Sequence, residues 1–155
     1  MHKVYTVNMV NLMPSRPKTT RSRGIRLPQT LDQEIQNQAE ARKLSWSAMS
    51  AELLEEAIRM RRAPGVVFGD GPAGRRAMLA GSGLDVWEVI ATWEEVGESL
   101  EALVESYPWL TQPQLRAALG YYAMYPDEID ARLQREAEWT PERVRRELPF
   151  AVPRR

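Results

Sequence analysis

The sequence predicts a mainly α-helical chain with a short strand ahead of two helices and one β-hairpin near its middle. Two observations support this prediction. Every second residue between 24 and 27 is apolar, which is the period expected of a half-buried strand. Two short apolar runs between 65 and 83 are separated and followed by glycines, whereas the stretches on either side repeat apolar residues at helical spacing.

Composition limits the class of protein. The chain has 155 residues, of which 43% are hydrophobic, enough for one ordinary domain or two small ones. No stretch approaches the roughly 18 to 20 apolar residues that a membrane helix needs, and the first residues are too polar for a signal peptide. The chain has no cysteine, so we expect no disulfide or thiolate site and take a reducing, cytoplasmic compartment as the default.

The net charge of zero hides a segregation along the chain. Residues 1–31 contain six basic and no acidic residues, whereas residues 64–155 contain ten basic and fifteen acidic ones. A basic arm on an acidic body indicates that one end contacts a polyanion and the other contacts something else. The alternative is a basic tail without a specific role.

Residues 1–19 show no periodicity and are treated as a flexible lead, followed by a DNA-binding region at 20–63. Pro28 ends the predicted strand, and a helix starts at Gln29 to Leu31 with a narrow apolar stripe. Ser45 or Ser47 can cap a second helix that ends in arginines near its negative pole. That helix is expected to bury one side, made of Met49, Leu53, Ala57 and Met60, with Leu54 and Ile58 close by.

Ala63-Pro64-Gly65 is the clearest boundary, and it opens a predicted small domain at 64–131. The hairpin comes first, and three helices follow it. Asp85, Ser99 and Thr111 are the predicted N-caps, and Gln114 completes a capping box with Thr111. The last region, 132–155, is expected to hold a C-terminal helix and an extended tail, with helix starts at Pro126 and at Thr140-Pro141.

One strand and two short helices bury little by themselves, but two copies that pair their strands form a two-stranded ribbon over four helices. Such a ribbon fits the major groove of DNA. Ile25 and Leu27 would then face the core, and the outward residues would contact base edges, with Arg26 as the best candidate to pair with guanine. The outward residues are Ser22, Gly24 and Arg26. The residues expected to contact backbone phosphates are Arg21, Arg23, Ser45 and Ser47. The alternative is an ordinary helical hairpin with a charged flank.

Residues 21–62 resemble the ribbon-helix-helix family of repressors and antitoxins. The resemblance rests on GIRLP, a helix, LSWSAMSAELLEEAI and an arginine-rich end. It implies a DNA-binding homodimer, or a higher assembly, that reads operator DNA through the outward strand residues. Gly24 departs from the family, because a polar side chain usually stands there. Trp46 departs as well, because a small or charged residue usually occupies that connection.

Residues 64–131 resemble a small bacterial domain of unassigned chemistry found in VapB-type antitoxins. The resemblance rests on the glycine-rich hairpin at 65–83, the helix start at 84–93 and the turn into a helix at 107–119. It implies an antitoxin of a type II toxin-antitoxin module that represses its own operon and neutralises a PIN-type ribonuclease toxin by direct binding. A stand-alone dimeric transcriptional regulator is the alternative, and a pure interaction adaptor is a third class.

The three helices after the hairpin also resemble a helix-turn-helix, whose third helix would read DNA. Residues 64–111 carry two basic and eight acidic residues, so bringing them to phosphates would cost electrostatic energy. A role in dimerisation or as a scaffold is therefore favoured. A second DNA contact through Gln112, Gln114 and Arg116 is the alternative.

The C-terminal region combines arginines with aromatic and aliphatic residues. In VapB-like antitoxins such a segment wraps the toxin, whose active site is a cluster of metal-holding carboxylates. An inserted arginine would pair with those carboxylates while apolar side chains fill a groove. The candidate partner-binding residues are Trp139, Arg143, Arg145, Arg146, Leu148 and Phe150. The alternative is a solvated helix with a frayed end.

No enzyme is predicted. The single histidine, His2, excludes a hydrolytic triad and a histidine-ligated metal site. The glycine-rich stretch 69–74 lacks the Gly-Lys-Ser/Thr ending of a phosphate loop and is better explained as a hairpin turn. The carboxylates between 94 and 105 lack histidine or asparagine neighbours and are expected to form a solvated face. We therefore expect no catalytic residue, metal or cofactor.

Overall fold

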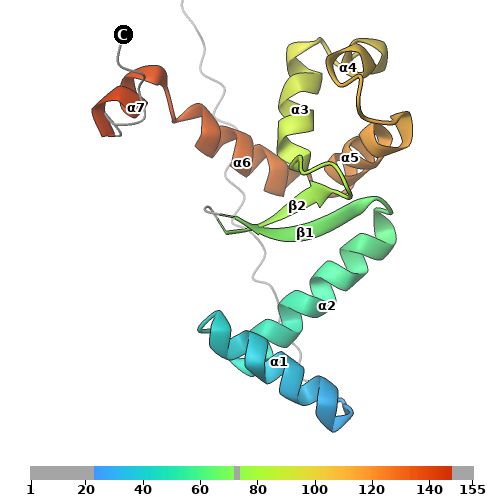
Figure 1. Ribbon diagram of the computed structural model, residues 1–155, viewed down its shortest axis with the longest axis vertical. Helices are drawn as coiled ribbons and strands as arrows, with labels where there is room; N and C mark the ends of the chain where they lie inside the picture. The colour runs from blue at the N-terminus through green and yellow to red at the C-terminus, as the bar shows by residue number, and fades with distance from the viewer. Residues whose placement is uncertain (1–22, 72–73, 148–155) are drawn as a thin grey trace, which may run out of the picture.

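The computed structural model describes residues 23–71 and 74–147, and most of these residues lie in helices, as predicted (Figure 1). A single two-stranded antiparallel hairpin interrupts the helices within this part of the chain. The elements in order are α1 Gln29–Ala41, α2 Trp46–Arg62, β1 Val66–Gly71, β2 Gly74–Leu79, α3 Val86–Glu95, α4 Leu100–Ser106, α5 Gln112–Met124, α6 Pro126–Ala137 and α7 Pro141–Glu147. The predicted lead at 1–19 and tail at 148–155 lie outside the described residues.

The predicted N-terminal strand is not formed within the single chain. Residues 23–28 belong to neither a helix nor a strand, and Arg21 and Ser22 lie outside the described residues. A strand needs hydrogen bonds from a neighbouring strand, and within the described chain β1 and β2 pair only with each other. The ribbon predicted here would form between two copies, so it remains a prediction.

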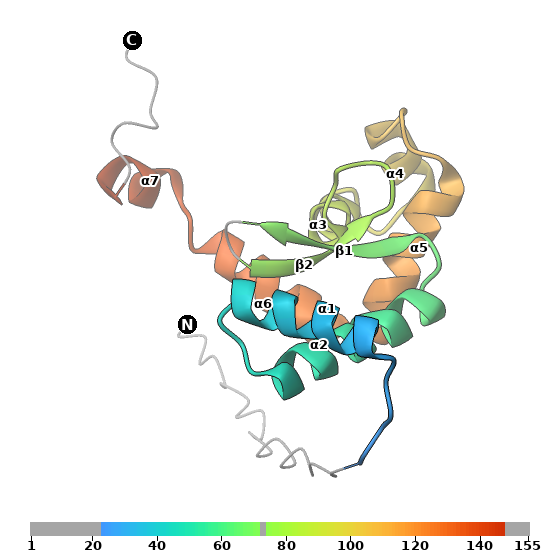
Figure 2. The same ribbon diagram turned by 60° about the horizontal axis from the view of Figure 1, so that its bottom comes forward.

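Helices α1 and α2 form a helical hairpin with a small core of its own, made of Ile35, Ala39 and Met49 (Figure 2). Lys43 adopts a left-handed φ of 55°, and the Leu44 amide donates to the Ala39 carbonyl at 2.8 Å. This Schellman arrangement satisfies free carbonyls at the end of α1 and reverses the chain. The chain can therefore start α2 at Trp46 after a short connection.

The hairpin pairs Val66 with Leu79 at its base and Gly71 with Gly74 at its tip. Alternation along each strand places Val66 and Leu79 in the core. At the turn from α2 into β1, Gly65 has a φ of 96°, and a Cβ there would lie 3.1 Å from the Cβ of Ala117 on α5. Glycine suits this position because of both its backbone conformation and the closeness of α5.

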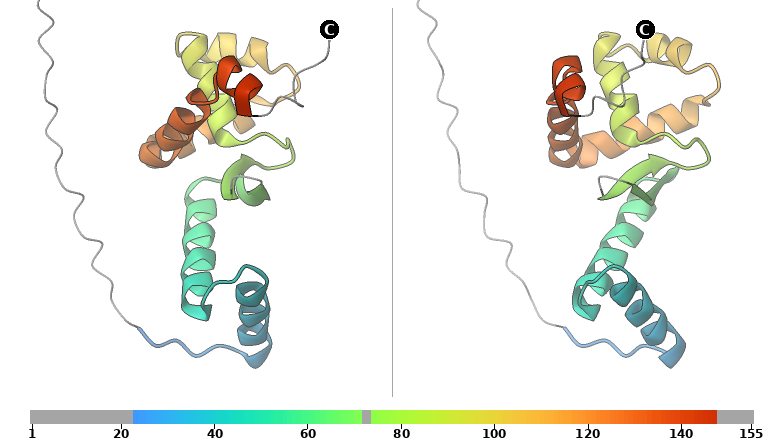
Figure 3. Two further views of the ribbon diagram at one scale, coloured as in Figure 1. Left: turned by 90° about the vertical axis from the view of Figure 1, so that its left-hand side faces the viewer. Right: turned by 60° about the vertical axis from the view of Figure 1, so that its left-hand side comes forward.

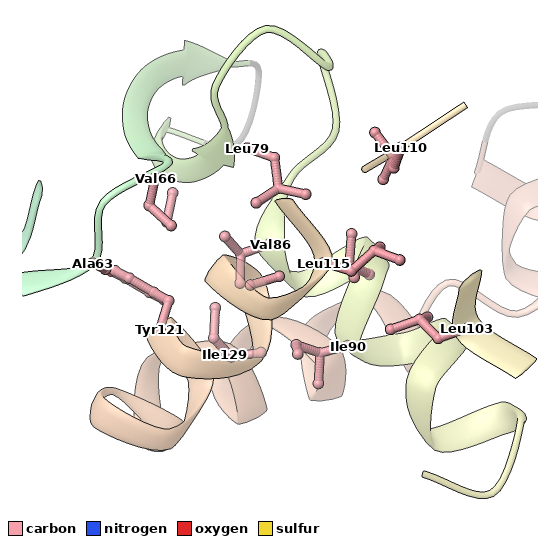
Figure 4. Packing of buried hydrophobic residues seen from close by; sticks show 13 residues of the cluster. Ala63, Val66, Leu79, Val86, Ile90, Leu103, Leu110, Leu115, Tyr121 and Ile129 are labelled. Carbon is pink, nitrogen blue, oxygen red and sulfur yellow. The ribbon is translucent and has the colours of Figure 1, made fainter. Parts of the chain in front are cut away.

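The main core lies where α3, α4, α5 and α6 meet the hairpin, and Figure 4 shows its side chains converging from these elements. The predicted inward residues of α3 are confirmed in part: Val86, Val89 and Ile90 are fully buried, whereas Trp93 is only half-buried. Tyr121 on α5 is the largest fully buried side chain. This core buries far more apolar surface than the small core of α1 and α2, so it contributes most of the hydrophobic stabilisation.

Local helix signals are confirmed. The Ser99 hydroxyl accepts a hydrogen bond from the Ala102 amide at 3.2 Å, and Thr111 and Gln114 form the predicted capping box. Asp85 occupies the N-cap of α3, and α6 and α7 begin at Pro126 and Pro141. The helix starts are therefore set by residues next to them in the sequence.

Figure 3 shows that α2 connects two parts of the molecule. Helix α1 lies at one end of α2, and the second part of the molecule, made of the hairpin and helices α3 to α6, lies at the other. The last turn of α2 leads directly into β1, and α2 also packs against β1. The predicted boundary near Pro64 falls at this turn, whereas the predicted boundary at 131/132 falls inside α6. Helix α6 runs unbroken from Pro126 to Ala137 and packs against α3 and α5.

Candidate nucleic-acid interface

The basic segment ahead of α1 lies at the surface. Arg23, Gly24, Ile25 and Arg26 are exposed, and Leu27 is half-buried. None of the described carboxylates forms an ion pair with Arg23 or Arg26. Both guanidinium groups therefore have free donors for phosphate or base edges.

An apolar groove lies beside this segment, between residues 25–27, α1 and α2. Its volume is about 170 Å³. It is lined by Ile25, Leu27, Leu31, Ile35, Ser50, Leu53 and Leu54. Its one polar residue, Ser50, already donates from its hydroxyl to the Trp46 carbonyl at 2.8 Å. The groove therefore offers apolar surface with no unsatisfied polar group in its wall.

The prediction that α2 buries Met49, Leu53, Ala57 and Met60 is wrong for two of the four. Met49 is buried and Leu53 is half-buried, but Met60 is 41% exposed and Ala57 is also exposed. Leu54 and Ile58, which were expected close to the buried side, are each 57% exposed. The reason is that α1 covers only one side of α2 and the hairpin covers only its C-terminal part. Leu54 and Ile58 continue the apolar surface of the groove along the open side of the helix.

The start of α2 is capped as predicted. Ser45 is the N-cap, and its hydroxyl accepts from the Ala48 amide at 3.1 Å. Ser47, the alternative cap, lies in the first turn and is exposed. Trp46 turns toward the small core and packs against it. The remaining free amides of this turn face outward at a positive helix end, which suits a phosphate.

Two ion-pair networks hold the C-terminal half of α2 against the second part of the molecule. The carboxylate of Glu56, which is largely buried, accepts from Nε and Nη2 of Arg75 on β2, at 2.6 and 2.8 Å. These charge-assisted hydrogen bonds raise the pKa of Arg75 above its usual range. Asp70 pairs with the same guanidinium at 3.2 Å.

The second network joins α2 to α5 and α6. Arg59 donates to the Tyr121 hydroxyl at 3.0 Å and pairs with Glu128, and it lies 4.6 Å from the centre of the Tyr125 ring. Burial and the charge of Glu128 raise the pKa of Tyr121 well above its usual value, so its hydroxyl stays protonated and donates to that carboxylate. The orientation of α2 relative to the second part is therefore fixed by directional contacts as well as packing.

Sequence reasoning missed both the groove and these networks. Leu54 was expected only to lie close to the buried side of α2, because periodicity shows which face of a helix is apolar but not whether a partner covers it. Glu56 carried a possible signal, since it stands beside apolar residues on a helix whose other carboxylates are exposed or half-buried. A buried carboxylate needs a cation, and Arg75 is one of two basic residues in the whole of 64–111.

The C-terminal candidates lie at the edge of the molecule. Figure 1 shows α7 standing away from the helices of the second part. Trp139 is 44% exposed, and the Arg143 guanidinium lies 4.6 Å from the centre of its ring. Arg145 and Arg146 are exposed on α7. Leu148 and Phe150 lie outside the described residues, as do Arg154 and Arg155.

The residues considered for a second DNA contact on α5 differ in their surroundings. Gln114 is committed to the fold, because its side-chain oxygen accepts from the Thr111 amide at 2.9 Å and its side-chain nitrogen donates to the Ala80 carbonyl at 3.2 Å. Gln112 and Arg116 are exposed. The start of α5 therefore leaves two of these three side chains available.

Within the described residues, no group of three or more histidine, cysteine, aspartate or glutamate side chains is arranged to hold a metal ion. In the same part of the chain, none of the helices combines the length and the apolar character that crossing a bilayer requires.

Comparison with known proteins gives one match. The family described as "Protein of unknown function (DUF433)" matches residues 66–122, which run from the start of β1 to near the end of α5. This span holds the hairpin and most of the main core, and it excludes α1, α2, α6 and α7. No curated protein and no solved structure matches the chain.

Proposed function

We propose that this protein is a homodimeric DNA-binding regulator in which residues 21–27 of two copies pair as an antiparallel ribbon. The observation that carries the proposal is the apolar groove, which lies open beside the exposed basic segment ahead of α1. The proposal joins an apolar surface that favours burial to the backbone of residues 23–27, which forms no backbone hydrogen bond within the described part of the chain.

The occupant that fits the groove best is a second copy of this chain. Ile25 is 58% exposed and Leu31 is 44% exposed, so a large apolar surface lies next to backbone groups that could form a ladder. A twofold axis through the paired segments would bring both grooves to the same interface, so one contact would bury both of them. Four helices from two copies would then enlarge the small core that α1 and α2 form by themselves.

In such a dimer, alternation directs Ile25 and Leu27 inward and presents the other face of the ribbon to the major groove. Arg26 is the proposed base reader. Arg21 and Arg23 would contact phosphates. In each copy, the N-terminal end of α2, at Ser45 to Ser47, would bind a further phosphate. Ser22 and Gly24 complete the outward face, and Gly24 has no side chain with which to read a base.

Replacing Arg26 with alanine is expected to weaken binding to the DNA upstream of the gene by about ten- to a hundredfold, while binding to scrambled DNA changes little. A bidentate arginine–guanine contact is lost only from the specific complex. Fluorescence anisotropy across a salt series measures both affinities. Arg61→Ala, which removes an exposed arginine from the far end of α2, is the charge-matched control. Equal weakening on both DNAs would contradict base reading by Arg26.

We further propose that the regulator is an antitoxin whose C-terminal region binds a PIN-type ribonuclease toxin. The proposal rests on the resemblance to VapB-type antitoxins and on the contact of the exposed Trp139 with the half-buried Arg143. An aromatic side chain beside arginines suits a partner with an apolar groove next to carboxylates. Under this proposal the protein represses its own operon and neutralises the toxin by direct binding.

Replacing Trp139 with alanine is expected to weaken the complex with a nuclease encoded beside this gene by at least about tenfold, because a large contact surface is lost. Titration calorimetry with the purified nuclease measures the change. Trp109→Ala is the matched control, since Trp109 is also exposed but lies between α4 and α5. Unchanged affinity for the Trp139 variant would contradict a role of this segment.

A stand-alone dimeric regulator is the alternative, in which the second part only dimerises or senses a ligand. The exposed residues of α7 would then be solvated. An adjacent gene for a small nuclease with an acidic active site favours the antitoxin, and its absence favours the stand-alone regulator. If the basic segment failed to bind DNA, an interaction adaptor would be the remaining class.

A further inference from the structure

A cavity of about 60 Å³ lies between β2 and α6, on the second part of the molecule. Its wall contains four arginines and a single carboxylate, that of Glu128. The arginines are Arg75, Arg76, Arg132 and Arg135. The first two are the only basic residues of 64–111, a segment with eight acidic ones. The fold therefore brings both basic residues of 64–111 to this cavity, together with two arginines of α6.

Three of these guanidinium groups, those of Arg75, Arg76 and Arg132, are paired with carboxylates that lie outside the cavity wall. Glu56 and Asp70 hold Arg75, which leaves it few free donors. Arg76 donates from Nε to Asp85 at 2.6 Å. Because a guanidinium has five N–H donors, a single contact of this kind leaves further donors for a ligand. Gly71 makes room for Arg76, since a Cβ at position 71 would lie 1.4 Å from the Nη1 atom of Arg76.

The two arginines of α6 have N–H donors without a partner among the described residues. Arg132 pairs through Nη2 with Glu136 at 2.7 Å, while its buried Nε has no hydrogen-bond partner in the described part of the chain. Its guanidinium lies 5.3 Å from the centre of the Trp87 ring, which limits its movement. Among the described residues, Arg135 has no carboxylate partner and donates only to the Ala131 carbonyl, at 3.2 Å.

We propose that this arginine-lined cavity binds a single phosphate group, either as inorganic phosphate or as the phosphate of a small phosphomonoester. The cavity volume of about 60 Å³ has room for one small oxyanion and is too small to enclose a nucleoside as well. Guanidinium forks that approach from β2 and from α6 match a tetrahedral anion with several acceptor oxygens. Arg132 already covers one face of the Trp87 ring, which closes that face to base stacking. This inference does not depend on the proposed DNA binding.

Thermal unfolding of the full chain in increasing sodium phosphate, with ionic strength held constant by sodium chloride, tests the proposal. We expect the Tm of the wild type to rise with the logarithm of the phosphate concentration once that concentration exceeds the dissociation constant. The Arg132→Gln/Arg135→Gln variant should need at least tenfold more phosphate for the same rise in Tm. Arg61→Gln/Arg62→Gln, which removes the same charge from the exposed end of α2, should behave as wild type. Arg135→Gln alone provides a second variant, since this side chain anchors no carboxylate and its loss should leave the fold intact.

A rise in Tm that is proportional to the phosphate concentration and equal in all variants would overturn the proposal, because phosphate also stabilises proteins by exclusion from their surface. Adenosine monophosphate as a second titrant separates the two sources of the anion. A variant-sensitive rise in Tm with both titrants assigns the site to phosphomonoesters in general, and such a rise with phosphate alone assigns it to the free ion. A short random DNA duplex that displaces phosphate from the wild type would identify a DNA-backbone contact instead, and would overturn a small-ligand site.

Discussion

Replacing Leu54 with glutamate is expected to convert the proposed dimer into a folded monomer and to abolish sequence-selective DNA binding. Leu54 is 57% exposed in the single chain and lines the apolar groove, so a carboxylate there stays solvated in the monomer. Pairing two copies would bury that charge twice, at a cost of at least about 4 kcal/mol per dimer, or roughly a thousandfold in the dissociation constant. Sedimentation equilibrium measures the assembly, and anisotropy on upstream DNA measures binding.

Met60→Glu is the control for this experiment. Met60 is exposed on the same helix but does not line the groove, so this variant should remain a dimer and bind DNA as the wild type does. Circular dichroism checks that both variants keep their helices. A wild-type protein that is monomeric at high micromolar concentration, or a Leu54→Glu variant that still dimerises, would contradict the proposed use of the groove.

Replacing Arg75 with leucine is expected to lower the free energy of unfolding by about 3 kcal/mol. The change leaves the largely buried carboxylate of Glu56 without its cation, and removing one partner of a buried pair is usually costly. The value lies at the low end of that range because Arg75 is partly exposed. Urea denaturation followed by circular dichroism gives the change in unfolding free energy.

The double variant Glu56→Leu/Arg75→Leu separates a lost cation from lost packing. Removing both charges leaves only the exposed Asp70 without its partner, so at least half of the lost stability should return. Glu55→Leu/Arg75→Leu is the matched control, because Glu55 is exposed and does not contact Arg75. If both double variants were as unstable as Arg75→Leu alone, the pair would not hold α2 against the hairpin.

Local sequence signals predicted most of the secondary structure. The N-caps at Ser45, Ser99 and Thr111, the starts at Pro126 and Pro141, and the hairpin between glycines are all confirmed. Each depends on residues a few positions apart, whose hydrogen bonds form within one turn of the chain. The small core of α1 and α2 was predicted less well, because the periodicity of α2 could not show that α1 covers only part of its apolar surface.

The sequence by itself determined where helices and turns begin and end, and it placed three arginines in a short segment ahead of α1. Only the tertiary structure decided which apolar residues of α2 remain open, which carboxylate holds Arg75, and that arginines from β2 and α6 share one cavity. The physical reason is distance along the chain. Caps and turns depend on neighbours in sequence, whereas burial and charge pairing depend on residues that only the packing of the whole chain brings together.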